Sequence, residues 1–244
     1  MRNSKLGKVQ KGCLGLASGM FILTLGLALF VASSLDAFLK NLRRQLPSAT
    51  ALASFEPSQT TQIYSGDGKV IATLYRENRT WVNLDQVSPW MEKAVLAIED
   101  SRFYEHHGVD PIGVFRAVYA QWKSGDRQGA STVTMQLARN VFLSSDQTME
   151  RKLKEALLAV EIEKSFTKQE IMEMYLNQIY LGSGAYGVQA ASRLYFNKGV
   201  KHLTPAQSAL LAGLPQHPNK YSPLVDETAA RDRTREVLGR MREK

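Results

Sequence analysis

Residues 149–164 read Met-Glu-Arg-Lys-Leu-Lys-Glu-Ala-Leu-Leu-Ala-Val-Glu-Ile-Glu-Lys and carry the clearest helical signal in the chain. Leu153, Leu157 and Val160 recur at intervals of three and four residues, which is the spacing of one face of an α-helix. Ala156 falls on the same face. We therefore predict an amphipathic helix over this stretch and a helical domain around it.

Helix-start signals lie on both sides of this stretch. Residues 167–170 (Thr-Lys-Gln-Glu) and 204–207 (Thr-Pro-Ala-Gln) have the form of capping boxes, in which two side chains satisfy the first free backbone N–H groups. Residues 88–89 (Ser-Pro) are a cap followed by proline at the first helical position, leading into a helix over 91–100. A second amphipathic stretch covers 112–122. The fold class that we expect is mostly α.

Two β-prone runs precede the helical region. Residues 61–64 (Thr-Gln-Ile-Tyr) and 70–75 (Val-Ile-Ala-Thr-Leu-Tyr) flank residues 65–69, which contain Gly-Asp-Gly. Short β-prone runs on either side of such a turn are typical of a hairpin. We expect one small β-hairpin at the start of the helical domain.

The N-terminal region contains an apolar run from Gly12 to Leu35, 24 residues without a charge. As a helix it would be about 36 Å long, enough to cross a hydrocarbon layer of about 30 Å. Basic residues precede it, which predicts a cytoplasmic N-terminus and an exterior remainder. The alternative is a signal peptide cleaved near Ala32, but the apolar part of such a peptide is usually about 7–15 residues. The predicted organisation is a cytoplasmic tail (1–11), a transmembrane helix (12–35), a juxtamembrane linker (36–60) and the helical domain with its membrane-proximal hairpin (61–244).

The formal net charge of +8 is distributed unevenly. Four basic residues precede the first acidic residue, Asp36, and the rest of the chain has 27 Lys and Arg against 23 Asp and Glu. This surplus suits an anionic lipid surface, a diphosphate or nucleic acid, and alone it does not choose among them. Cys13 is the only cysteine, so no intramolecular disulfide can form.

Polar clusters interrupt the helical pattern at several places. Residues 99–108, beginning Glu99-Asp100, follow an apolar run, and a partly desolvated carboxylate there would make a good general base. A solvated helix end is the ordinary alternative. Residues 129–136 combine small residues with hydroxyls and an amide, which suits an anion, or equally a loop that caps a helix.

Three more clusters follow along the chain. Residues 151–155 (Arg-Lys-Leu-Lys-Glu) put two cations and a carboxylate on one side of a helix, which is also the pattern of a surface ion pair. Residues 168–177 place Ile171 and Tyr175 on one helical face, which would normally be core, and end in Asn177. Residues 187–196 are typical of close helix packing through small residues.

Taken in order, these clusters resemble the motifs of the family 51 glycosyltransferases, the peptidoglycan polymerases. That family's patterns are Glu-Asp-x-x-Phe-x-x-His-x-Gly, Gly-Gly-Ser-Thr-x-x-Gln-Gln, Arg-Lys-x-x-Glu and Lys-x-x-Ile-x-x-x-Tyr-Leu-Asn. Here they begin at Glu99, Gly129, Arg151 and Lys168. The resemblance covers residues 61–224 and fits either a monofunctional enzyme or the glycosyltransferase domain of a class A penicillin-binding protein. Ala130 and Met135 depart from the second pattern, where the family usually has glycine and glutamine.

The resemblance implies a lysozyme-like helical fold with a smaller membrane-dipping lobe, for which residues 112–122 are the candidate. It implies that Glu99 is the general base on the acceptor's 4-hydroxyl and that Glu155 is a second catalytic carboxylate near the leaving diphosphate. The residues that it assigns to substrate binding or to the shape of the site are Asp100, Phe103, His106, Ser131, Thr132, Gln136, Arg139, Asn140, Arg151, Lys152, Lys168 and Asn177.

The same resemblance implies partners and location. The substrates would be lipid II and a lipid-linked growing glycan, at the outer side of a bacterial cytoplasmic membrane, beside cell-wall synthesis machinery and without nucleic acid. A divalent cation, Mg²⁺ or Mn²⁺, would bind at the diphosphate, with Glu155 as the candidate ligand and no organic cofactor. Two rival functions remain: a lysozyme-like hydrolase or lytic transglycosylase with Glu99 as general acid, and a non-catalytic membrane-tethered peptidoglycan-binding module.

Overall fold

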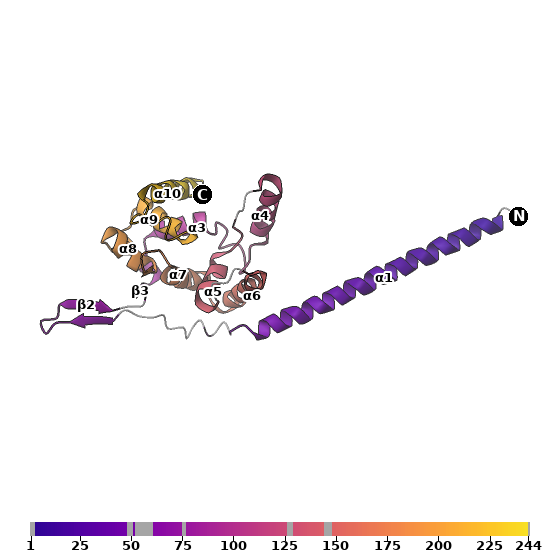
Figure 1. Ribbon diagram of the computed structural model, residues 1–244, viewed down its shortest axis with the longest axis horizontal. Helices are drawn as coiled ribbons and strands as arrows, with labels where there is room; N and C mark the ends of the chain where they lie inside the picture. The colour runs from indigo at the N-terminus through magenta and orange to yellow at the C-terminus, as the bar shows by residue number, and fades with distance from the viewer. Residues whose placement is uncertain are drawn as a thin grey trace. The chain divides into compact units, whose positions relative to one another are not determined.

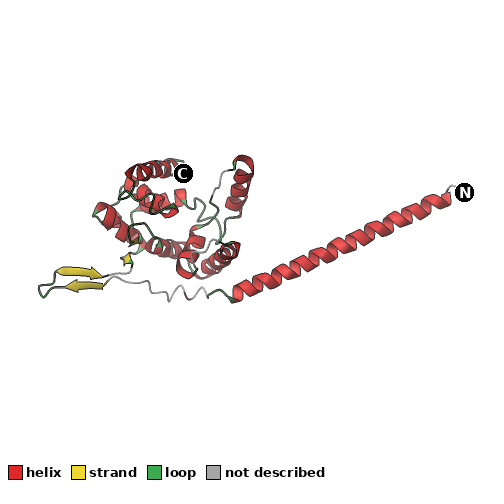
Figure 2. Ribbon diagram, in the orientation of Figure 1, coloured by secondary structure: helices red, strands yellow, loops and turns green. Residues whose placement is uncertain are grey.

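The computed structural model describes residues 3–47, 51, 61–74, 77–125, 129–143 and 148–243. The chain divides into two units, Met1–Leu46 and Pro47–Lys244. This division falls inside the predicted juxtamembrane segment 36–60, of which residues 48–50 and 52–60 lie outside the described residues. Figure 2 shows that helices dominate the structure and that the strands are short.

The first unit is a single long helix. Helix α1 (Asn3–Arg44) runs without interruption past both predicted boundaries, at residues 11–12 and 35–36. From Met20 to Phe38 its large apolar side chains are exposed, as at Phe21 and Phe30. Within the described residues, Met20–Arg44 is the one helical span long and apolar enough to cross a membrane, with a mean hydropathy of 2.0.

The predicted hairpin is present. Strand β1 (Thr61–Tyr64) pairs antiparallel with β2 (Val70–Leu74), with Thr61 opposite Leu74. Gly68 has φ +81° in the connecting turn, a conformation that side-chain-bearing residues rarely adopt. Tyr75, predicted to end the second strand, lies outside the described residues.

The mostly α prediction is confirmed for the second unit. Strand β3 (Asn78–Arg79) forms a short parallel pair with β4 (Ala185–Tyr186), which the sequence did not predict. The helices are α3 (Pro89–Ile98), α4 (Pro111–Ser124), α5 (Val133–Phe142), α6 (Met149–Ser165), α7 (Lys168–Gln178), α8 (Val188–Phe196), α9 (Pro205–Gly213) and α10 (Glu227–Arg242). Short 3-10 turns are η1 (Leu84–Gln86), η2 (Val200–His202) and η3 (Leu214–Gln216).

These helices form two packed groups. Helix α9 packs against both α3 and α10, and α5 packs against both α6 and α7 (Figure 1). Fully buried apolar side chains fill the two groups, among them Leu211 in the first and Leu137, Ile162 and Met172 in the second. Burying such side chains is the main favourable term in folding. Helix α3 ends at Ile98 with Glu99 as its C-cap, so the first sequence motif begins where the first group ends. Glu99 contacts Gln136 on α5, in the second group.

The capping signals are largely confirmed. Thr167 and Thr204 both form complete capping boxes, with Glu170 and Gln207 as their partners. Pro89 occupies the first turn of α3 as predicted, but the hydroxyl of Ser88 does not cap that helix. It donates instead to the backbone carbonyl of Leu203, 3.0 Å away, and so joins the start of α3 to the segment before α9.

The buried face of α6 differs from the predicted one. Leu153 is exposed, and the fully buried residues are Glu155, Leu158, Ala159 and Ile162. The apolar residues of this helix surround most of its circumference, so periodicity alone does not single out one face. The packing against α5 selects the face that contains Glu155, a buried carboxylate that pairs with Arg151 and Lys152.

Candidate active site

Glu99 stands at the C-terminal end of α3 and is half-buried. Its Oε2 accepts a hydrogen bond from Nε2 of Gln136, 2.6 Å away on α5. Burial raises the pKa of the Glu99 carboxyl above its ordinary value, because desolvation disfavours the charged form. The hydrogen bond from Gln136 and the positive charges of Arg233 and Arg139 offset part of this rise. The Glu99 carboxylate is therefore more basic than one in water, which is the property that a general base requires.

Asp100, the next residue, is buried and ties the first motif to the second. It accepts hydrogen bonds from the backbone N–H of Val133 at 3.0 Å and from Nε2 of His106 at 2.9 Å. Because an ionised carboxylate only accepts hydrogen bonds, Nε2 of His106 carries the proton. Gly108 closes the same loop: it has φ +83°, and a Cβ there would lie 2.7 Å from the backbone carbon of Ala159 on α6. Only glycine allows this approach.

Phe103 and Lys168 stabilise the loop of residues 99–108. Phe103 is fully buried, and Nζ of Lys168 lies 4.3 Å from the centre of its ring, within the range of a cation–π interaction. The same ammonium lies 2.8 Å from the carboxylate oxygens of Glu163, which also accepts a 2.5 Å hydrogen bond from Thr134. Lys168 therefore links α7, the end of α6 and the loop that holds Glu99.

The second motif forms the start of α5. Thr132 is its N-cap: the hydroxyl accepts from the N–H of Met135 at 3.1 Å and donates to the carbonyl of Gly108 at 2.6 Å. Met135, one of the two departures from the family pattern, is buried, so its apolar side chain needs no polar partner. Farther along the helix, Arg139 is half-buried and Asn140 is exposed.

The third motif makes a charged cluster beside the start of α5. Glu155 is fully buried and pairs with Arg151, one helical turn earlier. Lys152 Nζ lies 2.8 Å from the other oxygen of Glu155 and donates a 2.6 Å hydrogen bond to Ser131. Two cations surround one carboxylate, so the cluster retains one net positive charge, with Lys152 the more exposed of the two.

These residues do not fit a divalent cation held by the protein. Both oxygens of Glu155 already accept from Arg151 and Lys152, and like charge would repel a metal ion there. No group of three or more His, Cys, Asp and Glu side chains suited to a metal occurs in the part of the chain that the structure describes. The predicted role of Glu155 as a metal ligand therefore finds no support in its surroundings.

Asn177 lies outside both clusters and is buried at the end of α7. Its amide donates to the backbone carbonyls of Val82 and Glu173 at 2.8 Å, and its Oδ1 accepts from the N–H of Val82 at 2.9 Å. It thus fastens the segment before η1 to α7. This position is that of a structural brace, without contact to Glu99 or Glu155 among the interactions of the described residues.

Several residues at the site were not predicted from the sequence. Tyr175 was interpreted as core, yet its hydroxyl donates to Oε1 of Gln136 at 3.3 Å. Thr134 and Glu163 complete the support around Lys168. Arg233 on α10 acts electrostatically on Glu99 although they are far apart in sequence. Helical spacing relates residues within one helix, and these contacts join different helices, so only the tertiary structure reveals them.

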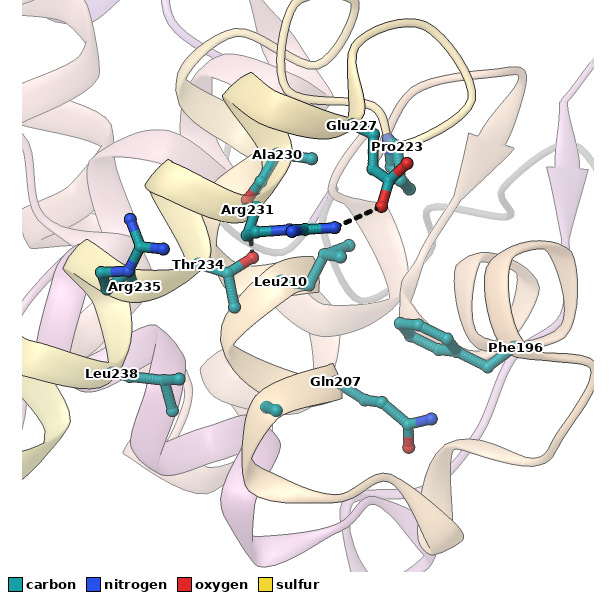
Figure 3. A pocket seen from close by; sticks show the side chains of 11 residues that line it. Phe196, Gln207, Leu210, Pro223, Glu227, Ala230, Arg231, Thr234, Arg235 and Leu238 are labelled. Carbon is teal, nitrogen blue, oxygen red and sulfur yellow. Dashed lines mark hydrogen bonds and ion pairs between the residues drawn. The ribbon is translucent and has the colours of Figure 1, made fainter.

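A separate pocket of about 450 Å³ lies on another part of the helical unit. Side chains of α9 and α10 line it, together with Phe196 and Pro223, and Figure 3 shows Arg231 reaching toward Glu227 at its edge. None of the predicted site residues belongs to this lining. The pocket is therefore distinct from the surroundings of Glu99.

Residues 131–136, which lead into α5 and form its first turn, contact both the Glu99 carboxylate and the cationic cluster on α6. Gln136 contacts the half-buried carboxylate of Glu99, and Ser131, five residues earlier, contacts the cationic cluster of Arg151, Lys152 and Glu155. A carboxylate of raised pKa near one end of this segment and positive charge near the other would suit a reaction that removes a proton from one reactant and releases an anion from a second.

Comparison with known proteins supports this interpretation. The protein family described as Transglycosylase matches residues 67–242. Penicillin-binding protein 1A of Escherichia coli (strain K12) is 48% identical over 90% of this chain and 26% of its own length. Penicillin-binding protein 1A of Aquifex aeolicus (strain VF5) is 44% identical over 91% of this chain and 30% of its own length.

Two further matches are also penicillin-binding proteins, of which this chain covers only a part. Penicillin-binding protein 1F of Bacillus subtilis (strain 168) is 44% identical over 75% of this chain and 26% of its own length. The crystal structure of Penicillin-Binding Protein 1A from Haemophilus influenzae matches with a TM-score of 0.42 and 27% identity, over 77% of this chain and 18% of that chain. The chain thus spans less than a third of the length of these relatives.

Proposed function

The chain belongs to the transglycosylase family, and from this premise we propose that it is a peptidoglycan glycosyltransferase that joins lipid II into β-1,4-linked glycan strands. The observation that carries the proposal is the contact of both chemical groups with residues 131–136: Glu99 through Gln136, and Lys152 through Ser131. A hydrolase needs a general acid, but it has no need of a cationic cluster that suits a departing diphosphate.

Glu99 is the general base of the proposed reaction. It takes the proton from the 4-hydroxyl of the acceptor sugar, and that oxygen attacks the anomeric carbon of the lipid-linked donor from the face opposite the lipid diphosphate. The bond from the anomeric carbon to the diphosphate breaks and the configuration inverts from α to β. Burial supports this role because it raises the pKa of Glu99 above its ordinary value, and a more basic carboxylate accepts a proton more readily.

The cationic cluster stabilises the leaving group. Negative charge develops on the diphosphate as its bond breaks, and preorganised positive charge lowers the free energy of that transition state. Lys152 is the more exposed cation, while Arg151 is held on buried Glu155. Glu155 therefore acts by orienting the two cations. Arg139 adds a further positive charge near Glu99, and the other predicted ligands, Ser131, Thr132 and Asn140, would position sugar and phosphate oxygens.

The membrane is the proposed location of this chemistry, since both substrates are lipid-linked. Helix α1 is apolar along Met20–Leu35, with basic residues before it, and we place the helical unit on the outer side. Helix α4 supports membrane contact because Phe115, Val118 and Trp122 are 72%, 64% and 82% exposed. In nanodiscs with brominated acyl chains, the tryptophan fluorescence should be quenched more in the natural chain than in Trp122→Phe. Equal quenching would rule out contact at Trp122.

Labelled lipid II tests the function directly. The full-length chain in detergent or nanodiscs should convert it into long glycan and release lipid diphosphate, and it should not cleave finished peptidoglycan. Cleavage without polymerisation would instead establish the lytic rival. Binding of peptidoglycan with neither reaction would establish the non-catalytic module.

A further inference from the structure

Tyr175 lies next to the proposed base without touching it. The ring is fully buried on α7, and the hydroxyl donates to Oε1 of Gln136 at 3.3 Å. The opposite end of the same amide, Nε2, donates to Oε2 of Glu99 at 2.6 Å. Three side chains from three segments of the chain thus form one line of hydrogen bonds that ends on Glu99.

We propose that Tyr175 is a positioning residue for the glycosyl transfer: it fixes the orientation of the Gln136 amide so that Gln136 presents its N–H group, and not its carbonyl, to Glu99. This inference rests on the proposed function, in which Glu99 is the base.

The side-chain amide of Gln136 has two chemically different ends, a carbonyl that accepts and an NH2 group that donates hydrogen bonds. Gln136 can turn about its last side-chain bond and exchange its oxygen with its nitrogen at nearly the same positions. An ionised Glu99 can only accept hydrogen bonds, so the exchanged orientation would place two acceptor oxygens against each other. The Tyr175 hydroxyl donates at the far end, which adds a second reason for the carbonyl to face away from Glu99.

The surroundings keep Tyr175 in its donor form. Burial raises the pKa of its hydroxyl well above the ordinary value, and the negative charge of Glu99 raises it further, so the phenol stays protonated throughout the pH range of the reaction. Donation to the amide carbonyl also polarises the amide and strengthens the hydrogen bond at its N–H end. Tyr175 therefore influences Glu99 through Gln136.

The charges around Glu99 define what an experiment should see. Arg233 on α10 and Arg139 on α5 favour its ionised form, and neighbouring Asp100 opposes it. The hydrogen bond from Gln136 favours the ionised form as well. If the amide turns away, the pKa of Glu99 rises further while these charges stay in place, and more of the enzyme is protonated and inactive at a given pH.

The test is the pH dependence of kcat/KM for lipid II, measured on the full chain. In Tyr175→Phe the acidic limb should move to higher pH, with a loss of roughly tenfold below that limb. The hydrogen bond that Tyr175 orients, from Gln136 to Glu99, is one to a charged group and is worth about that factor. Activity should recover toward the natural level at high pH, and KM should stay unchanged. Gln136→Met should move the acidic limb in the same direction. The double variant, with Tyr175→Phe added, should show the same shift as Gln136→Met alone.

A matched control removes a tyrosine hydroxyl elsewhere. Tyr195 is half-buried and donates to the carbonyl of Leu181 at 2.9 Å, so Tyr195→Phe should leave the pH profile unchanged. An equal loss at every pH in Tyr175→Phe, or an unmoved limb in Gln136→Met, would overturn the inference. An unmoved limb in Gln136→Met overturns the inference even if Tyr175→Phe does not fold. Failure of the natural chain to polymerise lipid II would instead remove the proposed function itself.

Discussion

The carboxylate of Asp100 accepts a hydrogen bond from the backbone N–H of Val133 at 3.0 Å. This contact joins the loop after α3 to the first residue of α5, across 33 positions of sequence. It places a negative charge at the N-terminal end of a helix, where the helix dipole stabilises it. Glu99 directly precedes Asp100, and Gln136, which donates a hydrogen bond to Glu99, lies three residues after Val133 on α5. Asp100 therefore helps to hold Glu99 in register with α5.

Replacement of Asp100 should therefore lower stability. Asp100→Ala leaves the N–H of Val133 and Nε2 of buried His106 without their acceptor, and each unsatisfied buried group costs about 1–3 kcal/mol. We expect the free energy of unfolding, measured by urea titration, to fall by about 3 kcal/mol. The control is Asp232→Ala on α10, whose side chain is 65% exposed and which should change stability by less than about 0.5 kcal/mol. Equal effects of the two variants would contradict this account.

Lys168 should contribute more to stability than an ion pair at the surface. Lys168→Met leaves Glu163, whose side chain is 4% exposed, with Thr134 as its one remaining hydrogen-bond partner among the described residues. Breaking a buried pair costs about 3–5 kcal/mol. Because Lys168 itself is 18% exposed, we expect a loss near the lower end of that range, about 3 kcal/mol.

The matched control for Lys168 lies on the neighbouring helix. Lys164 pairs with Glu161, and both side chains are largely exposed, so Lys164→Met should cost about 0.5 kcal/mol or less. Thermal or urea unfolding of both variants measures the difference. A Lys168→Met variant as stable as Lys164→Met would show that the contact with Glu163 and Phe103 has no structural weight.

Glu155 should affect catalysis without changing the titration of the base. Glu155→Gln removes the charge that orients Arg151 and Lys152, and loss of such preorganised groups lowers kcat by roughly a hundredfold. The acidic limb of the pH profile should stay where it is in the natural chain, because Glu99 and its partners are untouched. If Glu155→Gln instead moved the acidic limb and left the plateau value of kcat unchanged, Glu155 and not Glu99 would be the group that titrates as the base.

The sequence predicted the helices more reliably than their contacts. Capping at Thr167 and Thr204 depends on residues three apart in one helix, and both boxes are present as predicted. The buried face of α6 depends on what α5 presents to it, and there the periodic pattern indicated Leu153, which is exposed. Helix capping depends on residues close together in the sequence, so the sequence predicts it. Which apolar face of a helix is buried depends on the helix that packs against it, so the sequence of one helix does not determine it.

The site shows the same division. The order of the motifs predicted Glu99, Gln136, Lys152 and Glu155, and the structure brings them to residues 131–136, which lead into α5 and form its first turn. The sequence predicted Tyr175 only as a core residue and did not predict a role for Arg233. A core tyrosine and a catalytic-site tyrosine have the same helical spacing, and only the 3.3 Å contact with Gln136 separates them.

Glu99 should lower the stability of the folded chain at neutral pH. Its pKa is raised in the folded state, so folding favours the protonated form. The associated stabilisation is present below the unfolded-state value near 4.5 and is lost as the pH rises through the higher folded-state pKa. Glu99→Gln, which is uncharged at every pH, should therefore unfold at a higher temperature than the natural chain at pH 8 and at nearly the same temperature at pH 4. A less stable variant at pH 8 would contradict the raised pKa.

Polymerisation of labelled lipid II by Glu99→Gln is the most direct test of the central claim. The variant keeps the size of the side chain and removes its ability to take a proton, so glycan formation should fall by at least roughly a hundredfold at every pH. Lipid II binding and the melting curve should show that the chain remains folded. Unaltered glycan formation by this variant would contradict the assignment of Glu99 as the base.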